Sequence, residues 1–364
     1  MSLLSGLYGR ATRFRRAWYG RYPHRARQLA QPVISVGNLV VGGSGKTPVV
    51  SALARLLLAT GERPAILSRG YGRVHAADGV VVVSDGRQVL VAAPQSGDEP
   101  QMLARALPGV QVLVSPDRYL AGCLAERTFG CTVHLLDDGF QHVQLARDID
   151  LLVISTRDLD ERLLPSGRLR EPLEAAAAAD ALLMEGTDED AAAIVERLGI
   201  KNLFRMTSRY EAPRLVEPFG AALPASVGRR ALAVAGIARP ERFFAALRAE
   251  GWDVVEKLVF RDHHWFTTRD LESIRRAAVD VKADLVLTTE KDAARLDSRV
   301  TRDGGPVWAF LPLQAGIEPT PSFLVWMNDR LGAARDGRRQ GTVQPPFAGG
   351  IAERPDPSQG GEAA

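Results

Sequence analysis

The chain has 364 residues, of which 46% are hydrophobic and 24% charged, and this composition is typical of a folded protein of about two domains. Its two cysteines exclude a disulfide scaffold and a zinc site built from cysteines alone. The net charge of +3 is unevenly distributed: residues 1–61 carry eight Arg, one Lys and no acidic residue, whereas the remainder carries 37 basic and 43 acidic side chains. This concentration of basic charge indicates contact with an anionic surface or a polyanion at the N-terminal end.

The first predicted element is a helix over residues 3–22. Its apolar positions fall on one stripe of the helix: Leu4, Leu7, Ala11, Phe14, Trp18 and Tyr22. Such a stripe, beside the seven arginines of residues 10–27, is typical of a helix that lies in the headgroup region of an anionic membrane. Two alternatives remain, namely a helix packed on its own domain with a solvated basic face, and a contact with nucleic acid. No apolar run approaches the roughly 18–20 residues needed to span a bilayer, and no signal-peptide core follows the arginines.

The following elements predict a doubly wound, mostly parallel α/β sheet of the P-loop NTPase type. A short apolar strand at 32–37 leads through a glycine-rich turn into a helix at 48–60. Further strands are expected at 65–67, 80–83, 110–114, 133–136, 151–154 and 182–184. The five alanines at 175–179 predict one turn of an ordinary helix.

A second, smaller α/β unit is predicted after a stretch near 208–230 that is rich in proline and glycine. Its elements are expected at 231–235, 240–250, 254–259, 271–279, 285–288 and 307–310. The Gly- and Pro-rich end of the chain shows no periodicity and is expected to be disordered. The predicted segments are a basic helix at 1–30, a P-loop domain at 31–212, a linker at 213–230, a second α/β domain at 231–335 and a tail at 336–364.

The strongest motif is the run GGSGKT at residues 42–47, directly after a strand and before a helix. Its glycines allow backbone N–H groups to face phosphate oxygens, the lysine reaches the β and γ phosphates, and the threonine hydroxyl can bind Mg²⁺. Val40 stands where the strict P-loop pattern has its first glycine, and the alternative is a glycine-rich turn with a chance Lys-Thr pair. The candidate nucleotide-binding residues are Val40, Val41, Gly42, Gly43, Ser44, Gly45, Lys46 and Thr47.

Two acidic pairs are candidates for metal binding or catalysis. Asp137 and Asp138 end an apolar strand, where ligands gather in open α/β sheets, so one of them can hold Mg²⁺; the alternative is a capping pair. Because adjacent carboxylates point to opposite sides of an extended backbone, they need not share one role. Asp98 and Glu99 lie at a predicted helix start, where an N-cap Asp and a first-turn Glu are an equally plain interpretation.

A histidine and two basic turns complete the candidate residues. His263 follows Asp262 and can serve as a proton acceptor, or it can be a buried structural histidine. The Gly/Arg turns at 68–73 and 165–172 suit recognition of phosphate or sugar hydroxyls, although solvated loops are equally compatible. Candidate substrate contacts are Arg69, Tyr71, Arg73, Gln141, Arg168, Arg170 and Glu171.

Together these segments resemble the tetraacyldisaccharide 4'-kinases, the lipid A 4'-kinases of Gram-negative bacteria. The matching stretches, in the family's order, are 34–48 (ISVGNLVVGGSGKTP), 67–73 (LSRGYGR), 97–100 (GDEP), 135–142 (LLDDGFQH), 164–173 (LPSGRLREPL), 235–243 (AGIARPERF), 260–263 (FRDH) and 289–292 (TEKD). The basic aromatic helix at the N-terminus is also similar to the membrane-contacting start of that family.

The resemblance implies transfer of the γ-phosphoryl group of ATP to the 4'-hydroxyl of a tetraacylated glucosamine disaccharide 1-phosphate, which gives lipid IVA. It implies two α/β domains with the active site between them. Asp98 and His263 would be the catalytic pair, while Glu99, Asp137 and Asp138 would manage Mg²⁺ and the phosphates. It also implies a peripheral position on the cytoplasmic face of the inner membrane and no nucleic-acid partner; no protein partner is inferred.

Two other classes of protein fit the sequence less well than this family. A GTPase-like switch requires an [NT]-K-x-D motif, but in TEKD the lysine and aspartate are adjacent, which argues against guanine specificity. A peripheral membrane protein regulated by nucleotide would hydrolyse ATP without forming a phosphorylated lipid.

Overall fold

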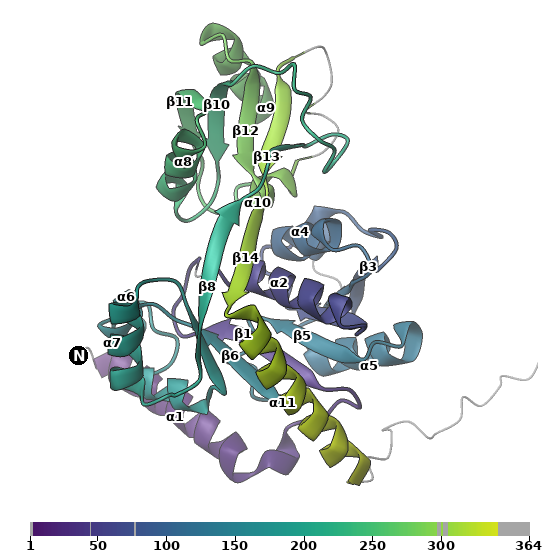
Figure 1. The fold of residues 1–364 in the computed structure, drawn as a ribbon, viewed down its shortest axis with the longest axis vertical. Helices are drawn as coiled ribbons and strands as arrows, with labels where there is room; N and C mark the ends of the chain where they lie inside the picture. The colour runs from purple at the N-terminus through teal and green to yellow at the C-terminus, as the bar shows by residue number, and fades with distance from the viewer. Residues whose placement is uncertain (1–2, 44, 76–77, 297–299, 301–304, 341–364) are drawn as a thin grey trace, which may run out of the picture.

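Two β-sheets organise the chain in this computed structural model, which describes residues 3–43, 45–75, 78–296, 300 and 305–340. The sheets form the centres of two α/β units that are stacked along the long axis of the molecule (Figure 1). Two antiparallel strands, β8 (Leu203–Tyr210) and β14 (Leu313–Glu318), run between the units. No helix among the described residues is long and apolar enough to cross a membrane.

The sheet of the first unit has nine strands within the described residues, in the order β14-β8-β7-β6-β1-β5-β2-β4-β3. Its inner strands are parallel and both edge pairs are antiparallel, as predicted for a mostly parallel sheet. The strands are β1 (Val33–Asn38), β2 (Pro64–Ser68), β3 (Val81–Asp85), β4 (Gln111–Val114), β5 (Val133–Asp137), β6 (Ile149–Val153) and β7 (Ala181–Met184). Every residue of β1 is buried, because helices and loops cover both faces of the sheet.

Helices cover this sheet on both sides. On one face α2 (Lys46–Ala59), α4 (Asp98–Ala106) and α11 (Thr320–Gln340) share a core with the strands. On the other face α5 (Arg118–Phe129) packs near the middle of the sheet, and α7 (Asp188–Leu198) packs with η2 (Leu173–Ala178). Shorter helices are η1 (Pro23–Arg25), α3 (Ala93–Ser96) and α6 (Thr156–Leu159). The alanine run lies largely in η2, which is a 3-10 helix rather than the ordinary helical turn that was expected.

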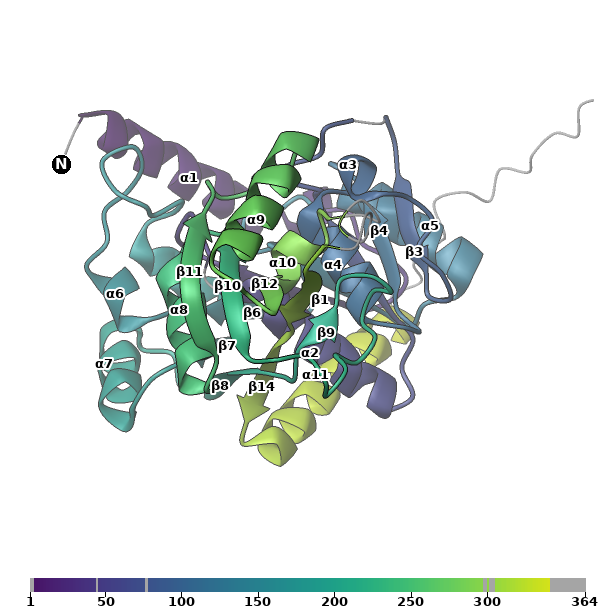
Figure 2. The same ribbon diagram turned by 90° about the horizontal axis from the view of Figure 1, so that it is seen from above.

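The second unit is a smaller sandwich of the same kind. Its sheet has the order β11-β10-β12-β13-β9, again for the described residues. The strands are β9 (Arg214–Leu215), β10 (Arg230–Ala235), β11 (Asp253–Val259), β12 (Leu285–Thr289) and β13 (Val307–Leu311). Helix α8 (Pro240–Ala249) covers one face and α9 (Thr268–Asp280) the other, while α10 (Glu290–Ala293) follows β12 (Figure 2).

The boundaries between the units differ from the predicted segments. Strand β14 and helix α11 belong to the first unit, so the second unit does not extend to residue 335. The predicted linker 213–230 contains β9, which pairs with β13 of the second sheet. Residues 336–340 form the end of α11, whereas the rest of the predicted tail, 341–364, lies outside the described residues.

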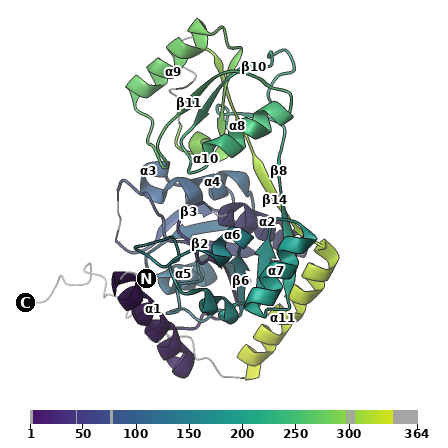
Figure 3. The same cartoon turned by 90° about the vertical axis from the view of Figure 1, so that its left-hand side faces the viewer.

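The N-terminal helix α1 (Leu3–Arg21) lies on the first unit, on the side away from the second unit (Figure 3). Its inner face is polar: Ser5 and Tyr8 donate hydrogen bonds to carbonyls of the loop at 163–170, and Arg16 forms an ion pair with buried Glu171. The apolar side chains of the stripe that are largely exposed are Leu4, Leu7, Phe14 and Trp18. The helix therefore packs on its own domain, as the packing alternative expects, but through polar side chains, and it leaves most of its apolar stripe exposed.

Candidate active site

The glycine-rich turn joins β1 to α2, as its sequence predicts, and Ser44 is its one residue outside the description. Gly42 and Gly45 have φ angles of 103° and 81°, which explains why glycine occupies both positions. The Lys46 ammonium donates a hydrogen bond of 2.9 Å to Oδ1 of Asn38 and lies 3.4 Å from Asp138. The turn therefore brings its lysine to the carboxyl end of the central strand.

The loop at 162–172 holds the start of this turn. The N–H of Val41 donates to the carbonyl of Arg168, and the Arg168 guanidinium donates back to the Val41 carbonyl at 2.8 Å. Val40 is buried and forms a β-bridge with Leu169. In this structure Val40 and Val41 are thus engaged with the loop, so their predicted contact with nucleotide remains a prediction.

Asp137 and Asp138 have opposite electrostatic surroundings. Asp138, with a φ of 57°, accepts two hydrogen bonds of 2.8 Å from Arg170. Burial opposes the ionisation of Asp138, but the bonds from Arg170 and the charge of Lys46 outweigh it and lower its pKa to about 2.

Asp137 is 3% exposed, and its Oδ1 has no hydrogen-bond partner among the described residues. Its pKa is raised to about 8, first by burial and then by the charges of Glu99 and Asp138. A buried carboxylate that faces two other carboxylates is stabilised in its charged form by a cation. The two acids therefore differ in their electrostatic surroundings, and their separate roles stay a prediction.

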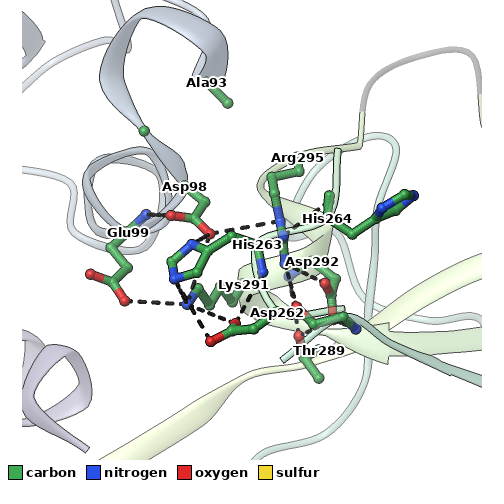
Figure 4. Close-up of polar contacts among 12 residues, drawn as sticks. Ala93, Asp98, Glu99, Asp262, His263, His264, Thr289, Lys291, Asp292 and Arg295 are labelled. Carbon is green, nitrogen blue, oxygen red and sulfur yellow. Dashed lines mark hydrogen bonds and ion pairs between the residues drawn. The ribbon is translucent and has the colours of Figure 1, made fainter. Parts of the chain in front are cut away.

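Asp98 and His263 meet across the two units. Asp98 is the first residue of α4 and is 2% exposed, and its Oδ2 lies 2.8 Å from Nδ1 of His263 (Figure 4). Burial raises the pKa of Asp98, but the hydrogen bond with His263 and the charges of Lys291 and Arg295 lower it below its usual range overall. The N-cap of α4 is Gly97, so capping does not account for Asp98.

A group of charged residues that was not predicted surrounds this pair. Lys291 of α10 lies 3.3 Å from Glu99 and 3.2 Å from the Nε2 of His263. Buried Arg295 donates to the carbonyls of His264 and Gly236, so it braces the loops on both sides of the site. Lys291 belongs to the motif at 289–292, so the sequence singles it out, but the motif does not indicate which side chains this lysine contacts.

Two further observations place the phosphate loop close to these residues. A Cβ atom added to Gly43 would lie 3.9 Å from the Cβ of Ala238, in the loop that follows β10 of the second unit. Glu99, which contacts Lys291, also contributes to the raised pKa of Asp137. The phosphate loop, the Asp137 carboxylate and the Asp98–His263 pair therefore line one region between the units.

The candidate substrate contacts divide into exposed and engaged residues. Tyr71 is 67% exposed, and its ring lies edge-on to that of His263 with centroids 5.2 Å apart. Arg69 is also exposed, whereas Nη1 of Arg73 is buried without a hydrogen-bond partner in the described part of the chain. The engaged residues are Gln141 on the Asn38 carbonyl, Arg168 on Val41, Arg170 on Asp138 and Glu171 on Arg16.

Buried Arg118 is a second basic residue that the sequence did not point to. Burial and the charge of Arg69 lower the pKa of its guanidinium to about 10, although the charges of Asp138 and Asp137 raise it. It begins α5, behind an N-cap aspartate, and nothing in its local sequence distinguishes it from a surface arginine.

Comparison with known proteins identifies the family of this chain. The family model for tetraacyldisaccharide-1-P 4'-kinase matches residues 1–332. The tetraacyldisaccharide 4'-kinase of Geobacter sulfurreducens is 40% identical over 325 residues, which cover 88% of this chain and 90% of that protein. The corresponding protein of Geobacter metallireducens is 39% identical over 331 residues, which cover 88% of this chain and 95% of that protein.

A solved structure of LpxK from Aquifex aeolicus, crystallised in complex with ATP, is similar to this fold with a TM-score of 0.74 and 33% sequence identity. It covers 90% of this chain and 97% of the LpxK chain. The fold, the sequence relatives and the family model therefore agree, and the chain belongs to the tetraacyldisaccharide-1-phosphate 4'-kinase family.

Proposed function

We propose how this chain performs the 4'-kinase reaction of its family. ATP bound at the phosphate loop donates its γ-phosphoryl group to the 4'-hydroxyl of a tetraacyl glucosamine disaccharide 1-phosphate, and the product is lipid IVA. The observation that carries this proposal is the 2.8 Å contact between Asp98 and His263, which joins the two units beside the phosphate loop.

In the proposed reaction the 4'-oxygen forms a bond to the γ-phosphorus, while the bond from that phosphorus to the β–γ bridging oxygen breaks and its electron pair leaves with ADP. The hydroxyl proton passes to His263, which Asp98 orients. A sugar hydroxyl is a weak acid, so a base that accepts its proton in the transition state accelerates the transfer by about 10²–10⁴-fold. Lys46 interacts with the β and γ phosphates in the manner of other P-loop lysines.

Mg²⁺ is proposed as the metal, with Asp137 as its carboxylate ligand and Thr47 as its hydroxyl ligand. The unpartnered Oδ1 and raised pKa of Asp137 fit a cation ligand, whereas Asp138 is already engaged by Arg170 and Lys46. One carboxylate and one hydroxyl from the protein are a donor set that suits Mg²⁺, which is usually bound by one or two carboxylates together with substrate phosphates. When bound, Mg²⁺ would neutralise charge that develops on the transferring group. Glu99, held by Lys291, keeps its predicted role toward the metal or phosphates as part of this proposal.

The second predicted partner is the cytoplasmic face of the inner membrane, contacted through α1. The exposed apolar side chains of α1 and the exposed Arg10 and Arg21 support this proposal. Not all seven arginines of residues 10–27 are available for headgroups, however, because others bind the protein. These are Arg13 on Glu174, Arg15 on the Gln141 carbonyl, Arg16 on Glu171 and Arg27 on Asp117.

The test is incubation of the protein with γ-labelled ATP and the disaccharide lipid in mixed micelles, followed by separation of lipid and inorganic phosphate. Label is expected in the lipid, and His263→Ala is expected to lower kcat by about 10²–10⁴-fold while the Kd for ATP stays within about twofold. His75→Ala, which removes an exposed histidine of the first unit, is the matched control. Label found only in inorganic phosphate would replace the kinase assignment with nucleotide-regulated membrane docking.

A further inference from the structure

Lys291 completes a charge arrangement around His263 that the proposed reaction does not yet use. Its Nζ lies 3.2 Å from Nε2 of His263, 3.3 Å from Oε1 of Glu99 and 3.5 Å from Oδ1 of Asp262 (Figure 4). An ammonium group has three protons to donate and no lone pair to accept with. The contact with His263 is a hydrogen bond and those with Glu99 and Asp262 are ion pairs, so all three neighbours are acceptors.

The charge of Lys291 is set by its neighbours. Burial lowers the pKa of its amine, but the nearby carboxylates of Glu99, Asp98 and Asp262 outweigh burial, so the pKa is raised overall. The amine is thus an ammonium ion at neutral pH and acts toward His263 only as a donor. Its partner Nε2 must then be the nitrogen that carries a lone pair.

The other ring nitrogen faces a carboxylate. Nδ1 of His263 lies 2.8 Å from Oδ2 of Asp98, a distance that places the imidazole proton on Nδ1 when the ring is neutral. The opposite tautomer would aim an N–H at the Lys291 ammonium and a lone pair at the Asp98 carboxylate, and both contacts would be repulsive. One tautomer of His263 therefore satisfies both of its neighbours.

We propose that Lys291 is a positioning residue for phosphoryl transfer, whose ammonium reserves Nε2 of His263 as the unprotonated nitrogen and keeps the ring proton on Nδ1. This inference rests on the proposed function, in which His263 accepts the 4'-hydroxyl proton. The acceptor hydroxyl then takes the place of Lys291 at Nε2, its proton passes to that lone pair, and Lys291 remains held by Glu99 and Asp262.

The position of Asp262 explains why a cation is needed beside Nε2 of His263. Its Oδ2 lies 3.8 Å from Nε2 of His263, so the ring stands between a carboxylate at each nitrogen. Without the ammonium, the Asp262 carboxylate would favour the tautomer that carries its proton on Nε2. In that tautomer Nε2 has no lone pair with which to accept the hydroxyl proton.

The direct test is the ¹⁵N spectrum of the full chain labelled at histidine, without ligand, near neutral pH. The His263 signals are assigned by their loss in His263→Gln. We expect the wild type to show a protonated Nδ1 and an unprotonated Nε2, and Lys291→Met to show protonation at Nε2. Lys291→Arg, which keeps a cationic donor, is expected to retain the wild-type tautomer to a large extent, and Lys282→Met, at an exposed lysine of the same unit, is the matched control.

Kinetics supply the second readout. Groups that fix the tautomer of a functional histidine are worth about 10- to 100-fold in activity, so Lys291→Met is expected to lose that much in kcat while the KM for ATP stays within about twofold. Lys291→Arg is expected to recover most of the lost kcat, and Lys282→Met is expected to keep the wild-type kcat.

Two results would overturn the proposal. The first is a proton on Nε2 of neutral His263 in the wild type, a measurement that depends on no variant being folded. The second is a Lys291→Met protein with the wild-type tautomer and wild-type kcat. Failure of the proposed function is separate: full activity of His263→Ala would remove His263 from the reaction, whereas the tautomer would still be read from the spectrum.

Discussion

Asp137 makes a prediction about stability that can be tested without substrate or metal. Its pKa of about 8 in the folded chain, against an ordinary value of 3.8, means that the folded state binds a proton which the unfolded state releases above about pH 4. The unfolded state therefore binds fewer protons between about pH 4 and 8, and stability falls as the pH rises through that window. Asp137→Asn removes the titrating group, so the variant should be the more stable protein there.

The size of the effect follows from the shift. Each pH unit inside the window is worth about 1.4 kcal/mol, so the advantage of Asp137→Asn in free energy of unfolding should grow from about 2 kcal/mol at pH 5 to about 4 kcal/mol at pH 7. The measurement is urea unfolding of both proteins at each pH with EDTA and no nucleotide, followed through the transition of the first unit.

Asp253→Asn, which alters an exposed carboxylate of β11, serves as the control and should leave the pH dependence unchanged. Unfolding free energies of wild type and Asp137→Asn that stay parallel from pH 5 to 7 would show that Asp137 is not protonated in the fold. The reasoning that makes it a cation ligand would then lose its main support.

Three other changes test the surroundings of the site. Replacing Phe14 and Trp18 together by Ser should weaken cosedimentation with anionic vesicles by about tenfold or more, because burial of each side chain is worth about 1.5–3 kcal/mol; unchanged binding would place the membrane contact elsewhere. Gly97→Ala should lower the thermal stability more than Gly199→Ala does, and it should also lower kcat. Both glycines have positive φ angles, but only at Gly97 would the added Cβ lie 2.6 Å from a carbonyl oxygen. Equal losses of thermal stability in the two variants would refute this steric argument. Arg338→Met should lower the free energy of unfolding by about 3 kcal/mol, because the largely buried Asp148 carboxylate loses its cation and keeps the Val33 N–H as a donor; a change within about 0.5 kcal/mol would show that this ion pair contributes little to stability.

Elements with strong local patterns could be predicted from the sequence. The strand β1, the phosphate loop and α2 follow one another within about 25 residues, and their apolar runs and glycines specify the local backbone whatever surrounds them. The last residue of β5 and the first residue of α4 could be recognised in the same way, so the sequence alone marks Asp137 and Asp98 as candidate site residues. Their charge states could not, because these depend on burial and on charges that other elements supply.

The connection between the units could not be read in this way. Strand β14 pairs with β8 although about a hundred residues separate them, and nothing local to β14 states which strand it will join. The apolar face of α11, with Phe323, Met327 and Leu331, is visible in the sequence, but the sheet that it covers is decided only when the chain returns from the second unit. The predicted second domain was therefore too long at its C-terminal end.

The sequence by itself determined the class of fold, the phosphate loop and which residues are candidates for the site, because each depends on short-range pattern and on the chemistry of single side chains. Its uneven charge also pointed to the exposed face of α1. Only the tertiary structure decided that Lys291 would stand between His263, Glu99 and Asp262, that Arg170 would hold Asp138, and that Arg16 would pair with Glu171. The physical reason is that an electrostatic environment is a sum over groups brought together by packing, and their separation along the chain carries no information about that sum.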